Sequence, residues 1–457
     1  MDFPAEFEAR ERALLGARFD TLYAYATPEP ARGVTVNTLR CPCAWFAAHA
    51  DFAAAPSPFC AAAFTTGAAW RPGRHPWHHA GVLYAQEPSA AAPAALLDVR
   101  PGMRVADLCA APGGKAGQLA AALQGQGLLL ANEYDAARAE ALRQNLERLG
   151  VTNAVVTNEA TARLAAALPG CFDRVLVDAP CSGEGMFRKE PAAAAQHSAA
   201  LVDHCAALGA AILDDAAALL APGGILVFST CTFAPQEDEA QVAAFLARHP
   251  EFALCDLSGC GFGQPGEANR APQTPGFAAA HCRRIWPADG GEGHFMAKLQ
   301  KAGEAAAPAA PRAKPQRPAK PPAEWGAFAA QYFPQLAGRP AAIAGEWVLL
   351  PAPGSEALPL ARLRVVRGGV LAGRVVKKRF EPAHALFMAW GAQCANCERL
   401  TRDDPRTAAW LRGEEIAAAT AAPGWCAVLV DGFPLGGGKV SGGRVKNHYP
   451  KALRTLR

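Results

Sequence analysis

Two cysteines stand where a covalent nucleophile would be useful. Cys181 ends the segment Val177-Asp178-Ala-Pro-Cys181 and Cys231 ends Phe228-Ser-Thr-Cys231, so each follows an apolar run that predicts a strand. A thiolate helped by nearby positive charge could add to a carbon of a base, while Asp178 hydrogen-bonds to the base's polar edge. Buried cysteines are usually inert, and the chain has fourteen. It is the matched position of these two that points to chemistry.

A glycine-rich loop, DLCAAPGGK from Asp107 to Lys115, opens directly into a predicted helix. Its glycines allow close backbone approach and the helix start favours negative charge, which suits a nucleotide-like ligand carrying a carboxylate or phosphate. The loop lacks the Walker spacing, and Ala116 stands where a hydroxyl would be needed. Glu133, at the tip of the next predicted strand, suits two ribose hydroxyls. A plain turn and a helix-capping acid remain the alternative on spacing alone.

The elements that must position these residues alternate along residues 103–299 between short apolar runs and helical stretches. This rhythm predicts an α/β fold with a mostly parallel sheet covered on both faces, whose ligands bind at the carboxyl ends of the strands. Apolar runs after residue 346, among them ARLRVV at 361–366, predict a smaller β-rich unit.

A stretch rich in Ala, Pro and Lys at residues 301–323 predicts an extended spacer. We therefore expect an N-terminal module over 1–80, a catalytic domain over 81–300, this linker, and a C-terminal region over 324–457.

Composition is that of a folded, water-soluble protein, with 457 residues, 51% apolar residues and net charge +4. The start MDFPAEFEAR has no signal-peptide pattern and no long uncharged apolar run follows. We therefore expect a cytoplasmic protein without a membrane segment, whose cysteines are thiols.

Positive charge is concentrated near the end of the chain. Residues 361–380 carry seven Arg and Lys and residues 439–457 carry six, in both cases without an acid. Such blocks indicate phosphate binding, although many are only solvated faces. Arg188 and Lys189, after the fourth predicted strand of the alternating region, present the same alternative between an RNA backbone contact and a solvated helix start.

The motifs DLCAAPGGK, DAPCSGEG and STCT together resemble those of the RNA 5-methylcytosine methyltransferases of the NOL1/NOP2/Sun family. The segments VNTLR, HHAGVLYAQEPSA, GMFRKE and KNHYPKALR are similar to the bacterial RsmF-type branch, which acts on 16S ribosomal RNA. This resemblance spans nearly the whole chain except the linker.

The resemblance implies a Rossmann-like class I methyltransferase core, a small N-terminal α+β, ferredoxin-like module and a C-terminal β-rich, PUA-like RNA-binding module. It also implies S-adenosyl-L-methionine as cofactor. The residues implied to hold it are Asp107, Cys109, Ala110, Ala111, Pro112, Gly113, Gly114, Lys115, Glu133, Asn158 and Asp178.

For the reaction, the resemblance implies that Cys231 is the nucleophile and that Cys181 assists product release. Cytosine C5 is a feeble nucleophile, but thiolate addition at C6 makes it enamine-like and able to take a methyl group. Asp178 would hold N3 and N4 of the adduct. RNA contacts are expected from Arg188 and Lys189 and, in the C-terminal module, from Lys446.

The implied partner is ribosomal RNA, within the small subunit or an assembly intermediate, and we expect a monomer. Two departures from the family pattern are Ala160, where relatives keep an Asp, and Gly436-Gly-Gly-Lys439, where an aromatic residue is expected. A tRNA substrate and a non-catalytic RNA-binding assembly factor are the alternatives. The histidines at 75–79 and the cysteine pairs at 41–43 and 394–397 lack the partners of a zinc site, so no metal is expected.

Overall fold

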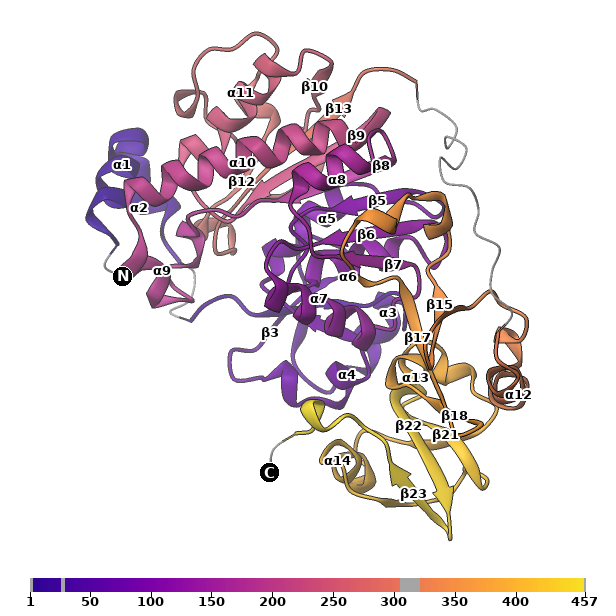
Figure 1. Cartoon of the computed structure of the whole chain (residues 1–457). Coiled ribbons are helices and arrows are strands. Elements are labelled where there is room, and N and C mark those ends of the chain that lie inside the picture. The colour runs from indigo at the N-terminus through magenta and orange to yellow at the C-terminus, as the bar shows by residue number, and fades with distance from the viewer. Residues whose placement is uncertain (1–2, 26–28, 305–320, 456–457) are drawn as a thin grey trace.

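A computed structural model describes residues 3–25, 29–304 and 321–455 (Figure 1). Most of the predicted linker lies outside the described residues. The centre of the molecule is a ten-stranded sheet whose main path runs β11-β12-β13-β9-β8-β5-β6-β7-β16. Its strands are β5 (Arg104–Asp107), β6 (Leu128–Asn132), β7 (Ala154–Thr157), β8 (Phe172–Asp178), β9 (Leu220–Thr230), β10 (Phe252–Leu254), β11 (Gln264–Pro265), β12 (Arg283–Ile285), β13 (His294–Lys301) and β16 (Val365–Arg367).

Strands β5 to β9 pair in parallel, as the alternating pattern predicts, and the α/β fold is confirmed. Helices cover both faces of this parallel part, which explains why its strands read as nearly continuous apolar runs. The helices of this part of the chain are α5 (Ala92–Leu96), α6 (Gly114–Ala122), α7 (Ala136–Arg148), α8 (Thr161–Ala167), α9 (Pro191–Gln196), α10 (Ala199–Leu219) and α11 (Glu239–Arg248).

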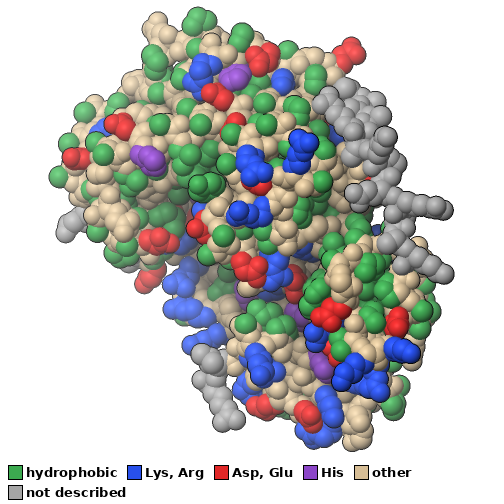
Figure 2. Space-filling model, in the orientation of Figure 1, with side chains coloured by type: hydrophobic (Ala, Val, Ile, Leu, Met, Phe, Trp, Pro, Cys, Tyr) green, Lys and Arg blue, Asp and Glu red, His purple; other side chains and the backbone are tan. Residues whose placement is uncertain are grey.

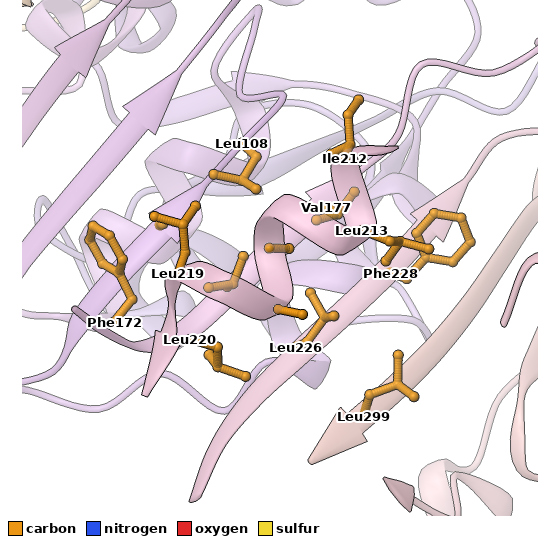
Figure 3. Packing of buried hydrophobic residues seen from close by; sticks show 14 of the residues in the cluster. Leu108, Phe172, Val177, Ile212, Leu213, Leu219, Leu220, Leu226, Phe228 and Leu299 are labelled. Atoms are coloured by element: carbon orange, nitrogen blue, oxygen red, sulfur yellow. The ribbon is translucent and has the colours of Figure 1, made fainter. Parts of the chain in front are cut away.

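Neighbouring residues of one strand serve opposite faces of the sheet. Val105 packs in the cluster under α6 and α7, while Ala106 packs in the cluster under α8, α10 and α11. Figure 3 shows the second cluster, where Leu213 of α10 packs with Leu226 and Phe228 of β9. This packing fixes the positions at which β8 and β9 end.

The N-terminal residues divide between two places. Helix α1 (Ala5–Leu15) packs on loops of the catalytic part, where the Phe7 ring lies 5.3 Å from the Phe187 ring between centroids. The rest forms a four-stranded sheet of order β2-β3-β1-β4. Its elements, with the helices near them, are β1 (Gly33–Val36), α3 (Cys43–His49), β2 (Ala54–Pro56), β3 (Ala63–Thr66), α4 (Pro76–His79) and β4 (Leu83–Ala85), whereas α2 (Phe19–Leu22) packs with α1.

The C-terminal region contains two small sheets, of four and five strands. The second shares a hydrophobic core with the N-terminal sheet, and the Trp77 indole donates a hydrogen bond of 2.8 Å to Asp431. The elements of the region are α12 (Ala323–Tyr332), β14 (Ala342–Ala344), β15 (Trp347–Pro351), β17 (Gly369–Val376), β18 (Arg379–Pro382), α13 (His384–Trp390), β19 (Cys397–Leu400), α14 (Pro405–Leu411), β20 (Ile416–Ala417), β21 (Gly424–Val430), β22 (Phe433–Ser441) and β23 (Arg444–Asn447).

One strand of the C-terminal region belongs to the catalytic sheet. The segment ARLRVV leads into β16, which pairs antiparallel with β7 at the edge of the ten-stranded sheet. Arg367 is buried there and donates a hydrogen bond to the Val151 carbonyl. The β-rich unit expected after the linker is therefore not separate from the catalytic part, because it supplies one of that part's edge strands.

Among the described helices, none combines the length and apolar character needed to span a bilayer.

Candidate active site

The two predicted cysteines meet at the carboxyl ends of neighbouring parallel strands. Asp178, the last residue of β8, is in register with Ser229 of β9. Because the chain leaves both strands at the same edge, the Cys181 and Cys231 sulfur atoms lie 3.4 Å apart. Both side chains are half-buried. The matched position in the sequence thus becomes direct contact in the structure.

Asp178 is held as a charged group beside the thiols. Its carboxylate accepts hydrogen bonds from the Lys115 ammonium at 2.8 Å and from the Ser229 hydroxyl at 2.7 Å. Burial opposes ionisation, but the charge and hydrogen bond of Lys115 outweigh it and lower the pKa of Asp178. The carboxylate is therefore a fixed acceptor at the end of β8.

The glycine-rich loop leads into α6 through a left-handed residue, Gly113, with φ of 115°. At Gly114 an added Cβ would lie 2.3 Å from the Gln86 amide oxygen, so a side chain does not fit there without movement. These two positions explain the glycines of the motif by backbone geometry and close packing.

An open cavity of about 660 Å³ lies along the ends of β5, β6, β8 and β9. It is lined by Cys109, Ala111, Glu133, Asp178 and both thiol residues. Its volume falls in the range usual for small-molecule sites.

Glu133 carries an unused acceptor in this cavity. Its Oε1 accepts a hydrogen bond of 3.0 Å from the Asp135 backbone N–H. The buried Oε2 accepts no hydrogen bond from the described residues, although the Arg138 guanidinium lies 3.4 Å away. A buried carboxylate oxygen without a hydrogen-bond donor gains from a ligand that donates to it. It fits the ribose hydroxyls of a nucleoside cofactor.

Asp107 lies at the end of β5 and is fully buried. Burial, followed by the charge of Asp178, raises the pKa of Asp107 to about 8. A cationic group bound nearby would reverse that effect, so Asp107 suits a ligand that brings a positive charge.

Asn158 does not line the cavity of about 660 Å³ but supports one of its loops. Its amide nitrogen donates to the carbonyls of Glu133 and Tyr134 at 2.9 and 2.7 Å, and its amide oxygen accepts from Arg364 at 2.9 Å. With these bonds made, Asn158 positions the Glu133 loop rather than offering a free group to an adenine ring.

A second cavity, of about 440 Å³, opens beside the first. Five residues line both cavities: Cys109, Ala111, Arg138, Asp178 and Cys231. Lys115 and Lys189 line only the second, which is thus cationic on one side. Two cavities that meet at a nucleophile and a carboxylate can hold a donor and an acceptor of a transferred group.

His294 also lines the second cavity, and the sequence reasoning missed it. It begins β13, the antiparallel neighbour of β9. Its Nδ1 lies 3.0 Å from the Ser89 hydroxyl, and burial lowers the pKa of His294 to about 3, so the ring is neutral. HFMAKL reads as a strand, but nothing local in that segment places its first residue beside Asp178.

The three residues predicted to contact RNA differ in their surroundings. Arg188 is buried and paired with Glu292, with its guanidinium 3.9 Å from the Tyr25 ring centroid, so it braces the loop instead of facing outward. Lys189 faces the second cavity. Lys446 is exposed on β23, in the far C-terminal sheet.

The larger hollow of the C-terminal region, about 1370 Å³, lies between its two sheets. Lys and Arg side chains are frequent on the visible face of this region, with acidic side chains among them (Figure 2). Cations sit over aromatic rings here, with Arg374 5.5 Å from the Trp347 centroid and Lys439 5.8 Å from that of Trp425. Stacking surfaces and positive charge together suit single-stranded nucleic acid.

Among the described residues, no group of three or more His, Cys, Asp or Glu side chains is arranged to hold a metal ion. The histidines and cysteines that were weighed as zinc ligands have other surroundings. Burial lowers the pKa of His78 to about 3. The Cys397 thiol donates a hydrogen bond to the Cys394 carbonyl at 3.1 Å.

Comparison with family models gives four matches along the chain. Residues 94–300 match the 16S rRNA methyltransferase RsmB/F, and residues 3–88 match the N-terminal domain of 16S rRNA methyltransferase RsmF. Residues 327–390 match the first C-terminal domain of the RsmF rRNA methyltransferase, and residues 397–455 match the methyltransferase RsmF PUA domain.

Two relatives carry the description ribosomal RNA small subunit methyltransferase F. The one from Klebsiella pneumoniae (strain 342) is 33% identical over 479 residues, covering 99% of this chain and 96% of the relative. The one from Shewanella amazonensis is 32% identical over 414 residues, covering 87% and 85%.

Among solved structures, a methyltransferase homolog protein from Pyrococcus horikoshii is 28% identical, with a TM-score of 0.56 over 65% of this chain and 94% of that one. NSun6 from the same organism, solved with SFG, has a TM-score of 0.55 at 19% identity, over 66% of this chain and 99% of that one, and shares the fold.

Proposed function

This chain belongs to the family of 16S rRNA methyltransferases of the RsmB/F type, and from that premise we propose that it methylates C5 of cytosine in 16S ribosomal RNA through a covalent bond between Cys231 and C6 of the base. It is an rRNA methyltransferase, and its cofactor is S-adenosyl-L-methionine.

The observation that carries the proposal is the junction of the two cavities at Cys231 and Asp178. The cavity beside Glu133 suits the cofactor, because a carboxylate oxygen without a hydrogen-bond donor and a glycine-rich loop match a nucleoside with an amino-acid tail. The cavity beside Lys115 suits the target base, which then lies between the nucleophile and the cofactor.

When bound, the cofactor supplies a methyl group made electrophilic by its sulfonium. Glu133 would hold its ribose, with Asn158 fixing the Glu133 loop, and residues 109–115 would wrap its remaining parts. Asp107 and Asp178 would face its positive charge. The remaining steps of the reaction are carried out by residues of this chain and by the base.

The Cys231 thiolate forms a bond to C6, and the electron pair of the C5–C6 double bond makes C5 nucleophilic. The Asp178 carboxylate accepts a hydrogen bond from the N4 amino group, and another from N3 once N3 has taken a proton from water, and so stabilises the adduct. After C5 has gained the methyl group it gives its proton to water in the open cavity, and the electron pair of the C5–H bond re-forms the C5–C6 double bond. The C6–sulfur bond breaks at the same time, and its electron pair returns to Cys231. Cys181, in contact with that sulfur, assists this release.

RNA would be held at two distant places. Lys189 faces the base cavity, whereas Lys446 and the aromatic, basic hollow between the C-terminal sheets lie far from the thiols. A monomer acting in the cytoplasm on the small subunit, or on an intermediate of its assembly, completes the proposal.

Bisulfite sequencing of total RNA from cells with and without the protein tests it. We expect one or more 16S cytosines to lose protection when the protein is absent. Identical 16S maps would contradict the proposal. Loss of protection in tRNA alone would reassign the substrate.

A further inference from the structure

One buried carboxylate connects the two loops that carry the thiols. Glu237, at the end of the short helix η5 (Pro235–Glu237), accepts hydrogen bonds from the Ser182 backbone N–H at 2.8 Å and from the Ser182 hydroxyl at 2.5 Å. The Ser182 hydroxyl oxygen lies 2.7 Å from that of Thr232. Ser182 follows Cys181 and Thr232 follows Cys231, so the bonds bracket the 3.4 Å contact between the sulfur atoms.

Glu237 differs from the other carboxylate at these loops. Glu184 accepts from the Phe233 backbone N–H at 3.0 Å and is ion-paired with Arg10 at 2.7 Å. Among the described residues Glu237 forms no ion pair, and its charge therefore acts on its surroundings without a cation in contact. One of the groups on which this charge acts is Cys181.

The two thiols face opposite charges. The Cys231 sulfur is close enough to Lys115 to raise the pKa of the ammonium, after the larger effects of burial, which lowers it, and of Asp178, which raises it. On the other side, hydrogen bonding to Cys231, burial and the Glu237 carboxylate together raise the pKa of Cys181. The Glu237 carboxylate thus disfavours the thiolate form of Cys181.

We propose that Glu237 is a positioning residue that divides the roles of the two cysteines: its hydrogen bonds to Ser182 fix the contact between the two sulfur atoms, and its carboxylate places a negative charge on the Cys181 side of that contact. The Cys181 S–H then donates to the Cys231 sulfur and stabilises the thiolate before addition and on release. The inference rests on the proposed function for its meaning, but its test does not require RNA.

The carboxylate itself titrates near neutrality. Burial raises the pKa of Glu237 to about 7, against the lowering effect of the Ser182 hydrogen bonds. Above that pH the carboxylate is ionised and disfavours a Cys181 thiolate, and below it the effect is lost. The groups that face Glu237 are Cys181, Cys205 of α10, Glu184 of η4 (Glu184–Met186), Arg10 of α1 and the adjacent Asp238.

The test is the ratio of alkylation rates of Cys181 and Cys231 by iodoacetamide in the full chain, read from their separate peptides by mass spectrometry. In the wild type at pH 8 Cys231 is expected to react faster. Glu237→Gln keeps the shape and removes the charge, so the ratio of Cys181 to Cys231 should rise about tenfold, the effect of one pKa unit.

Asp256→Asn is the matched control. Asp256 accepts from the backbone N–H and the hydroxyl of one serine, Ser258, at 2.7 and 2.9 Å, as Glu237 does, but it lies on an exposed loop. This variant should keep the wild-type ratio. The same ratio in Glu237→Gln as in the wild type and the control would overturn the proposal.

A second measurement needs no variant and stays decisive if Glu237→Gln fails to fold. In the wild type the ratio of Cys181 to Cys231 alkylation should rise as the pH falls from about 8 to about 6, because Glu237 then becomes neutral. A ratio that stays flat or falls would overturn the proposal. Absence of RNA methylation by a wild type with the expected ratios would instead contradict the proposed function.

Discussion

The centre and the edge of the large sheet are built in different ways. At the centre, β8 and β9 are neighbours both in sequence order and in space, and each brings its own motif to the same edge of the sheet. At the edge, β7 pairs with β16, a strand that follows some 200 residues later and comes from the C-terminal region. In the proposed reaction the centre holds the reactive groups, and the edge holds groups that support the Glu133 loop.

In the proposed reaction, the residues that react and the residues that hold the Glu133 loop thus lie in different parts of the sheet. Cys231 and Asp178 line the two cavities at the strand ends, whereas Arg364, next to β16, lines neither of them and is bonded to the Glu133 loop through Asn158. A substitution at the centre should therefore abolish a chemical step, and a substitution at the edge should weaken binding of the cofactor.

The largest effect is expected at the nucleophile. Cys231→Ala removes the only thiol placed to bond C6 in the proposed reaction, so methyl transfer to rRNA should be abolished. Cofactor binding, measured by calorimetry, should stay nearly unchanged because the cavity keeps its other lining. Full methyl transfer by this variant would remove Cys231 from the mechanism.

The next largest effect is expected from the hydrophobic packing of α10 against β9. Leu213 of α10 is completely buried against β9. Leu213→Ala should lower the free energy of unfolding by about 2–5 kcal/mol, from lost burial and the cavity left behind. Chemical denaturation measures it. Leu208→Ala, at a 40% exposed position of the same helix, is the control and should change stability little.

A smaller effect is expected from substitution of Glu133, which we propose to hold the cofactor. Glu133→Ala removes a buried charged acceptor, which costs about 1.5–3 kcal/mol, or roughly 10- to 150-fold in affinity for S-adenosyl-L-methionine. Calorimetric titration tests it, with Glu133→Gln as the variant that keeps the side-chain shape. Unchanged affinity in the alanine variant would place the ribose elsewhere.

The smallest effect is expected from substitution of Arg364, next to the edge strand β16. Arg364→Ala removes one hydrogen bond to Asn158 and should weaken cofactor binding by a few-fold, about 1 kcal/mol, without changing the chemical step. Arg362, in the same basic block but without a side-chain bond to the cofactor loop among the described contacts, supplies the control Arg362→Ala. Equal cofactor affinities in the two variants would mean that the edge does not support the site.

The sequence predicts the centre well because its information is local. Apolar runs, glycines at a helix start and polar residues after strand ends place Asp178, Cys181 and Cys231 without reference to distant parts of the chain. The residues of the glycine-rich loop that line the cavities follow the same logic, and Glu133 stands where strand order predicts.

The rest depends on contacts that no local pattern encodes. The run containing β16 reads like any short strand, and its pairing with β7 is decided by tertiary packing. Two arginines of the basic block at 361–380, Arg364 and Arg367, are used internally, so only part of that block is free for phosphate. His294 and Glu237 likewise reach the site by folding from segments without a recognisable motif. Removing residues 324–457 should accordingly expose the edge of β7 and not leave the catalytic part intact.

The central claim is that Cys231, and not Cys181, carries the covalent bond to the base. Cys181→Ala incubated with 16S rRNA and S-adenosyl-L-methionine should stall at release and leave a covalent protein–RNA complex, visible on a denaturing gel. Nuclease digestion and mass spectrometry then locate the attached nucleotide. We predict that it is found on the peptide containing Cys231. Normal turnover by Cys181→Ala, together with a trapped nucleotide on Cys181 in the Cys231→Ala variant, would contradict the account and reverse the two roles.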